Sequence, residues 1–527
     1  MVFFFGLSVF LCDPSSSSFI KKAGVVVAME KDLSVKWSLL LLVLLFLVVG
    51  GLKSYFALSS PTLQDGQAYY TLDQVGAILE TGHPRFNDPY SYRGARVFFL
   101  PGFYYVLAFF ALFIPELIVV KIVPAFLMAS LVFPLYVLSH YFFKQRHVAL
   151  LTAFAGAFVP VFWSTVNSVS PYTLVLPLLL WVLYAFFAIE KRMIAYFVLF
   201  GVLLLTHPSV VLFVLALLFY FILLKTEHLT SGDAELEMGL FSLFSLLWVY
   251  LILFKKLFAL HGISFIWLNL PSQLIDDIFA RFSILTGIYQ ISIIPFCAGI
   301  FAIYYFVFRR QHPKVYLLIS FAILALLLIW FGFFPLQDGL LILGMLLVLL
   351  ASFTYKEFLA YFEKTKFASR VNLVILGIVV LFVVTAVLPS LHTARSSVSN
   401  SLSQEEIGAL MYLKDVTPFS AVIFGNVEDG FLLSTFAHRR NIIEPHFLMA
   451  KDAEERYSDV KRIFTTESLI EALTLLEKYE ADYVYLSRST IFNPDANTVK
   501  FNNKCFQLVY DNIVKIYHIE CHVREIS

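Results

Sequence analysis

Apolar runs long enough to cross a lipid bilayer recur along this chain from Trp37 onward. A helix needs about 20 consecutive apolar residues to cross the hydrocarbon core of a membrane. The hydropathy pattern predicts spans at 37–56, 117–142, 148–166, 172–189, 194–206, 209–224, 239–254, 284–308, 315–332, 336–352 and 371–388. With about eleven such segments, we predict a mainly α polytopic membrane protein.

The composition supports this class and excludes others. Hydrophobic residues make up 60% of the chain and charged residues 14%, whereas soluble domains carry about a quarter charged residues. The formal net charge of +1 offers no field that would hold a nucleic acid, so we expect no nucleic-acid partner. Four cysteines in 527 residues exclude a disulfide scaffold and a cysteine-rich metal site.

The distribution of Lys and Arg predicts the orientation in the cell membrane. We expect the apolar segment 98–114, which Pro101-Gly102 interrupts, to lie on or dip into the outer face without spanning. All short basic loops then fall on one side, which the cytoplasmic bias of Lys and Arg identifies as the inside. These basic residues are Lys21, Lys22, Lys31, Lys144, Arg146, Lys191, Arg192, Lys225, Arg309, Arg310, Lys314, Lys356, Lys364, Lys366 and Arg370. The N-terminus is therefore predicted to be cytoplasmic and the C-terminus outside.

Three regions follow from this topology. They are a cytoplasmic N-terminal segment 1–36, a membrane domain 37–388 with outer loops 57–97 and 255–283, and a small extracytoplasmic α/β domain 389–527. Residues 1–28 are either an extension of the gene model, with the natural start at Met29, or a cleaved signal.

The tail after residue 389 has the composition of a soluble domain. Ser403 and Glu406 form a capping box that opens a helix to about Leu413. We expect the remaining elements to be a strand at 421–424, a helix at 466–479, a strand at 481–486, and a hairpin of 505–510 and 513–520. Cys505 and Cys521 lie on neighbouring predicted strands and are candidates for a disulfide, while Cys12 and Cys297 look unpaired. Alternating helices and strands predict a small α/β domain.

The first outer loop contains the acids that are the first candidates for chemistry. Asp65 follows the first span, where a carboxylate outside the membrane is suited to accept a proton or to bind a divalent cation such as Mg²⁺ or Mn²⁺. The alternative is that Asp65-Gly66 is a turn that caps the next helix. Asp88-Pro89 also has the pattern of a turn.

The order of these parts resembles the GT-C glycosyltransferases, and among them the oligosaccharyltransferase catalytic subunits and related archaeal and bacterial membrane proteins. In that family an Asp after the first span precedes aromatic residues, a helix, a Gly, a second Asp-Pro and then Pro-Gly. The matching residues here are Asp65, Tyr69, Tyr70, Gly82, Asp88-Pro89, Tyr92, Gly94 to Arg96 and Pro101-Gly102. A weaker likeness covers Asp429-Gly430-Phe431 with Arg439 downstream, where oligosaccharyltransferases carry a Trp-Trp-Asp-Tyr-Gly motif and an Arg.

The resemblance implies roles for particular residues. Asp65 would be the catalytic or metal-binding acid, with Asp88 as a second catalytic acid. The residues that we expect to bind substrate are Tyr69, Tyr70, Arg85, Arg93, Arg96, His207, Asp429 and Arg439. The arginines suit the phosphate of a lipid carrier, although snorkelling at the membrane interface and surface ion pairs would account for most such residues. His207 is also suited to capping a helix at the interface.

Two departures from the family pattern bear on the predicted metal site and on the predicted acceptor. The loop 165–172 contains no carboxylate, although those enzymes place further acids there, so a two-acid metal site is not predicted. The Trp pair before Asp429 is also missing, which disfavours glycosylation of an acceptor asparagine. Paired acids occur at Asp276-Asp277, but they have the pattern of a helix N-terminus as well as of a metal site.

Three functions remain to be compared. The first is a hexosyltransferase-type glycosyltransferase that moves a sugar from a polyprenyl-phosphate carrier to a glycan, lipid or protein acceptor at the outer face. The second is a lipid or glycan transporter or flippase, which requires polar groups near the bilayer midplane. The third is a GT-C-like scaffold without catalysis. An outward cavity joining Asp65, Asp88, loop 165–172 and loop 255–283 would favour the first.

Overall fold

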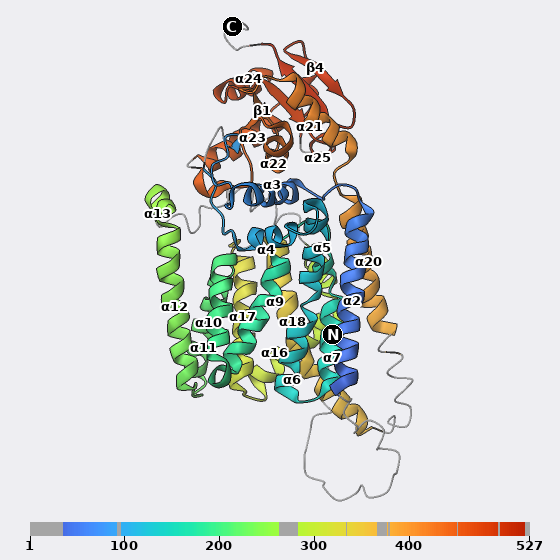
Figure 1. The fold of residues 1–527 in the computed structure, drawn as a ribbon, viewed down its shortest axis with the longest axis vertical. Coiled ribbons are helices and arrows are strands. Elements are labelled where there is room, and N and C mark those ends of the chain that lie inside the picture. Colours follow the sequence, from blue (N-terminus) through green and yellow to red (C-terminus); the bar gives the residue numbers. More distant parts are fainter. Residues whose placement is uncertain are drawn as a thin grey trace, which may run out of the picture.

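The computed structural model describes residues 35–91, 96–262, 283–333, 335–365, 377, 380–450, 452–493 and 496–521. A bundle of helices carries a small mixed domain at one end, which we call the domain end; the opposite end is the far end (Figure 1). The long bundle helices are α2 (Val35–Ser59), α5 (Glu116–Ala129), α6 (Val132–Phe143), α7 (Arg146–Ala157), α9 (Tyr172–Phe187), α10 (Ile189–Thr206), α11 (Val210–Thr226), α12 (Asp233–Leu253), α16 (Ile293–Phe308), α17 (Pro313–Trp330) and α18 (Leu336–Glu363). This architecture confirms the predicted mainly α polytopic class with a C-terminal α/β part.

Apolar length identifies the helices that can cross a membrane unaided. Within the described ranges these are five segments: Val35–Ser59, Glu116–Phe143, Asp233–Leu253, Pro313–Trp330 and Leu336–Tyr361. The shorter apolar helices α9 and α11 lie on the predicted spans 172–189 and 209–224. Residues 371–376, 378 and 379 of the predicted span 371–388 lie outside the described residues, and α20 (Leu388–Ser399) continues beyond its predicted end.

The predicted span 284–308 is not one straight helix. It is divided into α15 (Ile284–Ile291) and α16, which meet at an angle of 97°. Ser292 lies at the break with a φ of 72°, and its hydroxyl donates to the Thr385 carbonyl over 3.0 Å. A positive φ cannot be accommodated inside an α-helix, so the chain turns at this residue. Neither glycine nor proline marks position 292, and the sequence pattern therefore predicted a continuous span.

The segment 98–114 forms a short helix at the domain end. Helix α4 (Gly102–Ala111) has 10 residues, which corresponds to about 15 Å, half of a bilayer core. It lies between the bundle and helix α3 (Gly66–Thr81) of the first loop (Figure 1). A Cβ at Gly102 would lie 2.9 Å from Thr206 Cα, so glycine permits α4 to rest directly on the end of α10. The expectation that this segment does not span is confirmed.

The C-terminal domain contains a five-stranded sheet in the order β2-β1-β3-β5-β4. Its strands are β1 (Val422–Phe424), β2 (Arg440–Asn441), β3 (Tyr483–Leu486), β4 (Phe506–Asp511) and β5 (Lys515–Ile519). β1 pairs in parallel with β2 and β3, and β5 pairs antiparallel with β3 and β4. Its main helices are α21 (Gln404–Val416), α23 (Ala453–Thr465) and α24 (Leu469–Lys478). The predicted strands and hairpin are confirmed within a few residues.

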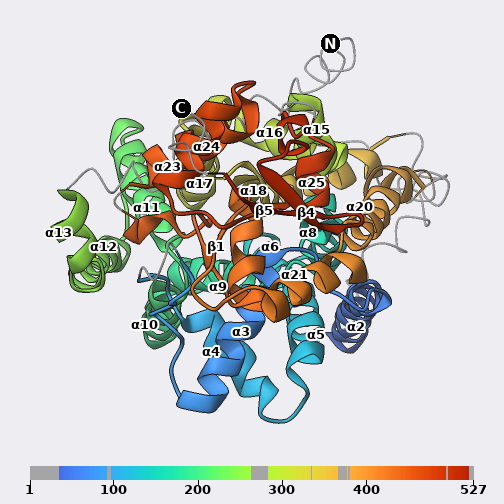
Figure 2. The same ribbon diagram turned by 90° about the horizontal axis from the view of Figure 1, so that it is seen from above.

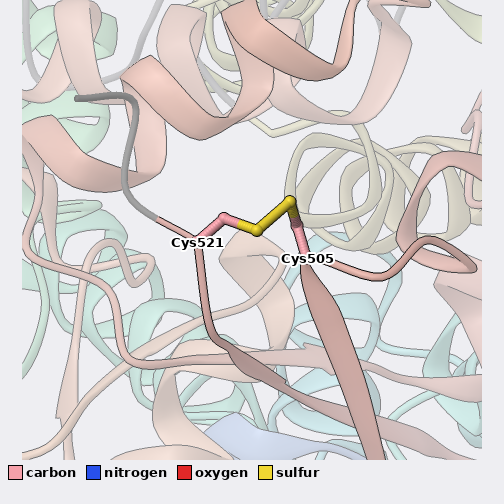
Figure 3. The surroundings of a disulfide bond; sticks show 2 residues. All are labelled: Cys505 and Cys521. Atoms are coloured by element: carbon pink, nitrogen blue, oxygen red, sulfur yellow. A yellow bond between two sulfur atoms is a disulfide. The ribbon is translucent and has the colours of Figure 1, made fainter. Parts of the chain in front are cut away.

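Local signals in this domain act as the sequence predicted. Ser403 caps α21, and Glu406 completes the reciprocal capping box. Cys505, just before β4, and Cys521, just after β5, form a disulfide that closes the open end of the hairpin (Figure 3). Their Cα atoms are 4.9 Å apart. Cys297 is a free cysteine, and Cys12 lies outside the described residues.

The first loop and the C-terminal domain share one hydrophobic core. Side chains from α3 and α4, such as Val75 and Phe103, pack in the same buried cluster as Leu410, Ile423 and Tyr485 of the domain. Figure 2, viewed from the domain end, shows the sheet over the bundle, with α3 and α4 along one side. The C-terminal domain therefore packs directly on helices α3 and α4 of the first loop.

Candidate functional site

Asp65 occupies the N-cap of helix α3. Its Oδ1 accepts a hydrogen bond from the backbone N of Ala68 over 2.9 Å, which satisfies one of the free N–H groups of the first turn. The side chain is half-buried. Burial raises the pKa of this carboxyl to about 6, and the negative charge of Glu428 adds to the rise. Asp65 is therefore both the helix cap that the turn pattern predicted and an acid with a perturbed pKa.

Gly66 allows the start of α3 to touch the C-terminal domain. A Cβ at this position would lie 3.0 Å from Phe431 Cβ and 3.3 Å from the backbone oxygen of Glu428. Those residues lie in a turn of 3₁₀ helix at Val427–Asp429 and the short helix α22 (Gly430–Leu432) that follows it. The fold thus brings together the two segments that carry the family resemblance.

Asp429 itself faces inward. Its side chain is 4% exposed, and its Oδ2 accepts from the backbone N of Asn426 in a capping box. Burial raises the pKa of Asp429 to about 7, against the lowering effect of a hydrogen bond from Ser487. This carboxyl supports the turn that presents Glu428 and Phe431, and we do not retain it as a residue that contacts substrate.

Asp88 lies in a second group of acids. Its Oδ1 accepts from the backbone N of Tyr90 over 2.9 Å, so it forms the turn that the Asp-Pro pattern predicted. Burial raises its pKa to about 6, and the charges of Glu444 and Asp73 raise it further. The neighbouring acids that raise the pKa of Asp88 are not the one that raises the pKa of Asp65. The two predicted catalytic acids therefore lie in separate surroundings.

Glu444 is the residue of this second group that the sequence analysis missed. It is fully buried and accepts hydrogen bonds from Ser91 Oγ and from Asn441 Nδ2, the latter over 3.2 Å. Its Oε1 also lies 3.6 Å from His446 Nδ1. An acid directly after the apolar pair Ile442-Ile443 was the available signal, because a charge in an apolar run is costly unless it has partners.

The two tyrosines of α3 pack against the domain. The hydroxyl of Tyr69 accepts from the backbone N of Leu63 over 3.1 Å, and its ring lies 4.7 Å from that of Phe436. The ring of Tyr70 lies 4.9 Å from Phe431 and 4.6 Å from His446, and only 2% of its surface is exposed. Both rings join loop to domain, and their burial leaves little area for stacking on a sugar.

The predicted arginines fall into different settings. The side chain of Arg85 is half-buried and forms an ion pair with Asp73 over 3.1 Å. Arg96 is exposed, and its backbone forms an isolated antiparallel β-bridge with that of Asn87. Arg439 is 6% exposed, and its five N–H groups all donate to protein oxygens of Lys414, Thr417, Ala437 and His438. An arginine has five donors, so none of those of Arg439 remains for a phosphate, and we leave it out of the site. Arg93 lies outside the described residues.

His207 lies at the C-cap of α10, on the domain end of the bundle. Its Nδ1 accepts from the backbone N of Ser209 over 3.1 Å, and its ring lies 4.7 Å from that of Tyr172. These contacts are those of an interfacial cap. Asp338, in the first turn of α18, is a further acid that the sequence did not single out.

Loop 165–172 lies next to the segment that leads into Asp65. The backbone N of Gln64 donates to the Asn167 carbonyl over 3.1 Å, and Asn167 Nδ2 donates to the Thr62 carbonyl over 3.0 Å. Asn167 has a φ of 70°, which asparagine tolerates better than most residues. Two buried lysines, Lys53 and Lys121, line a small cavity beside this loop. Most of loop 255–283, including Asp276-Asp277 and Arg281, lies outside the described residues.

The described acids do not fit a resident divalent cation. Within the described part of the chain, no three His, Cys, Asp or Glu side chains lie close enough to hold a metal ion. Around Asp65 the neighbouring acid is Glu428, and Asp429 is committed to its cap. Divalent cations such as Ca²⁺ and Mg²⁺ need several oxygen ligands, so we derive no chemistry through a metal.

Comparison with known proteins defines the fold. No family model matches the sequence, and the search of curated proteins found no match. An oligosaccharyltransferase from Archaeoglobus fulgidus, crystallised with a tethered acceptor peptide, superposes with a TM-score of 0.63 at 16% identity, over 87% of this chain and 70% of that one. ArnT from Cupriavidus metallidurans superposes with a TM-score of 0.54 at 14% identity, over 90% of this chain and 97% of that one. The chain has a GT-C-like fold.

A third structure agrees with this assignment. The arabinofuranosyltransferase AftD from Mycobacteria superposes on 93% of this chain and 42% of its own, with a TM-score of 0.54 at 13% identity. In this chain, the first loop and the C-terminal domain meet at the domain end of the bundle. At these identities the likeness establishes the fold alone, and the activity must be argued from the residues.

Proposed function

We propose that the protein is a membrane glycosyltransferase that transfers a sugar from a polyprenyl-phosphate-linked donor to an acceptor hydroxyl at the outer face of the membrane. The observation that carries the proposal is the position of Asp65. It caps the start of α3 beside the segment that carries Glu428, and burial raises its pKa to about 6. A carboxylate with a pKa just below neutral pH is well matched to act as a general base.

Solved structures with the same fold support the class of donor. The Archaeoglobus fulgidus protein AglB was solved with a dolichol-phosphate, and ArnT from Cupriavidus metallidurans was solved with undecaprenyl phosphate. Both ligands are polyprenyl phosphates, so we infer a donor of this chemistry here. Arg85 and Arg96, from the same loop as Asp65, are our candidates for contacting its phosphate.

In the proposed step, Asp65 takes the proton of the acceptor hydroxyl while the acceptor oxygen forms a bond to the anomeric carbon. The bond between that carbon and the phosphate oxygen breaks, and polyprenyl phosphate leaves with the electron pair. In this scheme, burial, with a smaller contribution from the negative charge of Glu428, keeps the pKa of Asp65 high enough for it to accept the proton.

We place the C-terminal domain outside the cytoplasm. The Cys505–Cys521 disulfide supports this orientation, because disulfides persist in oxidising compartments. The same orientation puts the short basic loops of the far end in the cytoplasm. Asp65 then lies on the outer side of the membrane, as the proposed reaction requires.

A substitution of Asp65 tests the proposal. Membranes containing Asp65→Asn should transfer radiolabelled sugar from a polyprenyl-phosphate donor about 10²–10⁴-fold more slowly than wild type. The matched control is Asp415→Asn, which removes the same charge from an exposed position on α21 and should retain wild-type transfer. Wild-type transfer by Asp65→Asn would remove this residue from the mechanism.

A GT-C-like scaffold without catalysis is the second candidate. One observation favours it. Neither the small cavity beside Lys53 nor a cavity of about 480 Å³ at the far end of the bundle is lined by Asp65 or Asp88. The same assay separates the two candidates. Absence of transfer by the wild-type protein with each of several polyprenyl-phosphate sugars, in membranes where the protein is folded, would favour the scaffold.

A further inference from the structure

A cavity of about 480 Å³ opens at the far end of the bundle, opposite the domain. It is lined by residues of α6, α16 and α18 and by the turn that leads into α17. None of the residues assigned to the proposed glycosyl transfer lines it. The cavity is therefore separate from the proposed site of glycosyl transfer.

Its inner wall is an aromatic cluster centred on Phe353. The ring of Phe353 lies 4.7 Å from that of Phe143, 4.9 Å from Phe306 and 5.2 Å from Phe142. Interlocked rings of this kind form a firm apolar surface. The wall is suited to hold the apolar part of a ligand, such as the glycerol backbone and the first methylenes of a lipid.

Its rim is positively charged. Arg310, Lys356 and Lys364 line the cavity, and Glu357 is the one acid among its lining residues. Arg310 and Lys364 are exposed and form no ion pair with another described residue. Lys356 Nζ lies 5.5 Å from the centre of the Phe143 ring, so it is held at the junction of the charged rim and the aromatic wall.

Exposed aromatic side chains lie at this rim and on the adjoining end of α16. Phe308, Phe358 and Tyr361 are 71%, 46% and 45% exposed. Exposed aromatic residues at the end of a membrane bundle lie at the level of the lipid headgroups and upper acyl chains. The cavity thus opens toward the bilayer as well as toward water.

We propose that this cavity binds the headgroup of an anionic glycerophospholipid, with the phosphate at the rim formed by Arg310, Lys356 and Lys364 and the acyl chains along the exposed aromatic residues. Basic pockets between helices on the cytoplasmic side of membrane proteins have this chemistry. A zwitterionic headgroup would bring its own cation to a rim with three cations and one acid. The proposal does not depend on the glycosyl-transfer reaction.

Binding of defined lipids to the purified full-length protein tests the proposal. In detergent solution, native mass spectrometry should detect specific binding of dioleoylphosphatidylglycerol and much weaker binding of dioleoylphosphatidylcholine. The triple variant Arg310→Gln/Lys356→Gln/Lys364→Gln should bind phosphatidylglycerol about 100-fold more weakly, because each basic residue near a lipid surface contributes to affinity. The matched control Lys191→Gln/Lys225→Gln/Arg309→Gln removes three exposed charges from the same end without touching the cavity, and it should bind as wild type does.

A second variant separates the cavity from general surface charge. Ala360→Trp fills the cavity and leaves every charge in place, so it should also abolish specific phosphatidylglycerol binding. Normal binding by this variant would overturn the proposal, as would equal loss in the two triple variants. Equal binding of phosphatidylcholine, or displacement of phosphatidylglycerol by undecaprenyl phosphate but not by a second anionic phospholipid, would also overturn it.

Discussion

The hydroxyl of Ser91 donates a hydrogen bond to the carboxylate of Glu444, across 353 residues of sequence. Both side chains are fully buried, and Ser91 belongs to the first loop while Glu444 belongs to the C-terminal domain. One residue earlier, the Tyr90 carbonyl accepts from the backbone N of Asn441 over 3.0 Å. Polar contacts thus fix the loop to the domain in addition to their shared hydrophobic core.

Removal of the Ser91 hydroxyl should weaken this attachment. Ser91→Ala leaves a buried carboxylate with one partner fewer, so we expect the free energy of unfolding to fall by about 1.5–3 kcal/mol. Chemical denaturation of the detergent-solubilised protein measures the change. Ser399→Ala is the control, because that hydroxyl is exposed and bonds only to the nearby Ser396 carbonyl. Equal stabilities of the two variants would show that the Ser91 contact contributes nothing.

Two glycines of the C-terminal domain should respond oppositely to alanine. A Cβ at Gly430 would lie 2.3 Å from the Ile443 carbonyl oxygen, so Gly430→Ala should destabilise the protein by about 1–3 kcal/mol or more. At Gly408, exposed within α21, the nearest such atom is 4.0 Å away, and Gly408→Ala should stabilise the helix by about 1 kcal/mol. Thermal unfolding of both variants measures these effects. A stable Gly430→Ala protein would contradict the close packing of α22 on residues 443–444.

The rate of sugar transfer should depend on pH through Asp65. Because the carboxylate form acts as the base and its pKa is raised to about 6, transfer should fall as the pH drops through 6 and stay level above about 7. Glu428→Gln removes a charge that raises this pKa, so the midpoint should move to lower pH. Asp415→Asn should leave it unchanged. A wild-type rate that stays constant from about pH 5 to 8 would argue against a base of this pKa.

The disulfide provides a test of stability and of orientation. Replacement of Cys505 and Cys521 by serine opens a loop with a sequence separation of 16 residues, which should cost about 3 kcal/mol of stability. Cys297→Ser should leave both the stability and the disulfide intact. In whole cells, an impermeant thiol reagent should label the domain cysteines only after reduction. Labelling without reduction would show that the bond does not form there.

The sequence predicted those features whose causes are local. The Ser403–Glu406 box, the hairpin around Asp511-Asn512 and the cap at Asp65 all depend on residues within a few positions of one another. The apolar runs likewise predicted most of the bundle, because the bilayer imposes their length.

Features that depend on distant partners were not predictable in this way. The burial of Glu444 depends on Ser91, and the saturation of Arg439 depends on the end of α21. At the bend, Ser292 bonds to the distant Thr385 carbonyl, and the one local signal was Pro295, which cannot donate the helical hydrogen bond to residue 291. The sequence analysis did not predict that Asp65 lies beside the segment after residue 426, and residue type alone did not separate the exposed Glu428 from the buried Asp429.

The contact between Gly66 and the turn at Glu428–Phe431 also constrains the order of biosynthesis. The ribosome makes α3 just after the first membrane helix, but its partner is made only after the last one. During that interval the rings of Tyr69 and Tyr70 lack their contacts with Phe436, Phe431 and His446, and Asp65 lacks the neighbouring charge of Glu428. The surroundings of the proposed base are therefore complete only when the whole chain has been inserted, so a prematurely terminated chain reaches the membrane without them.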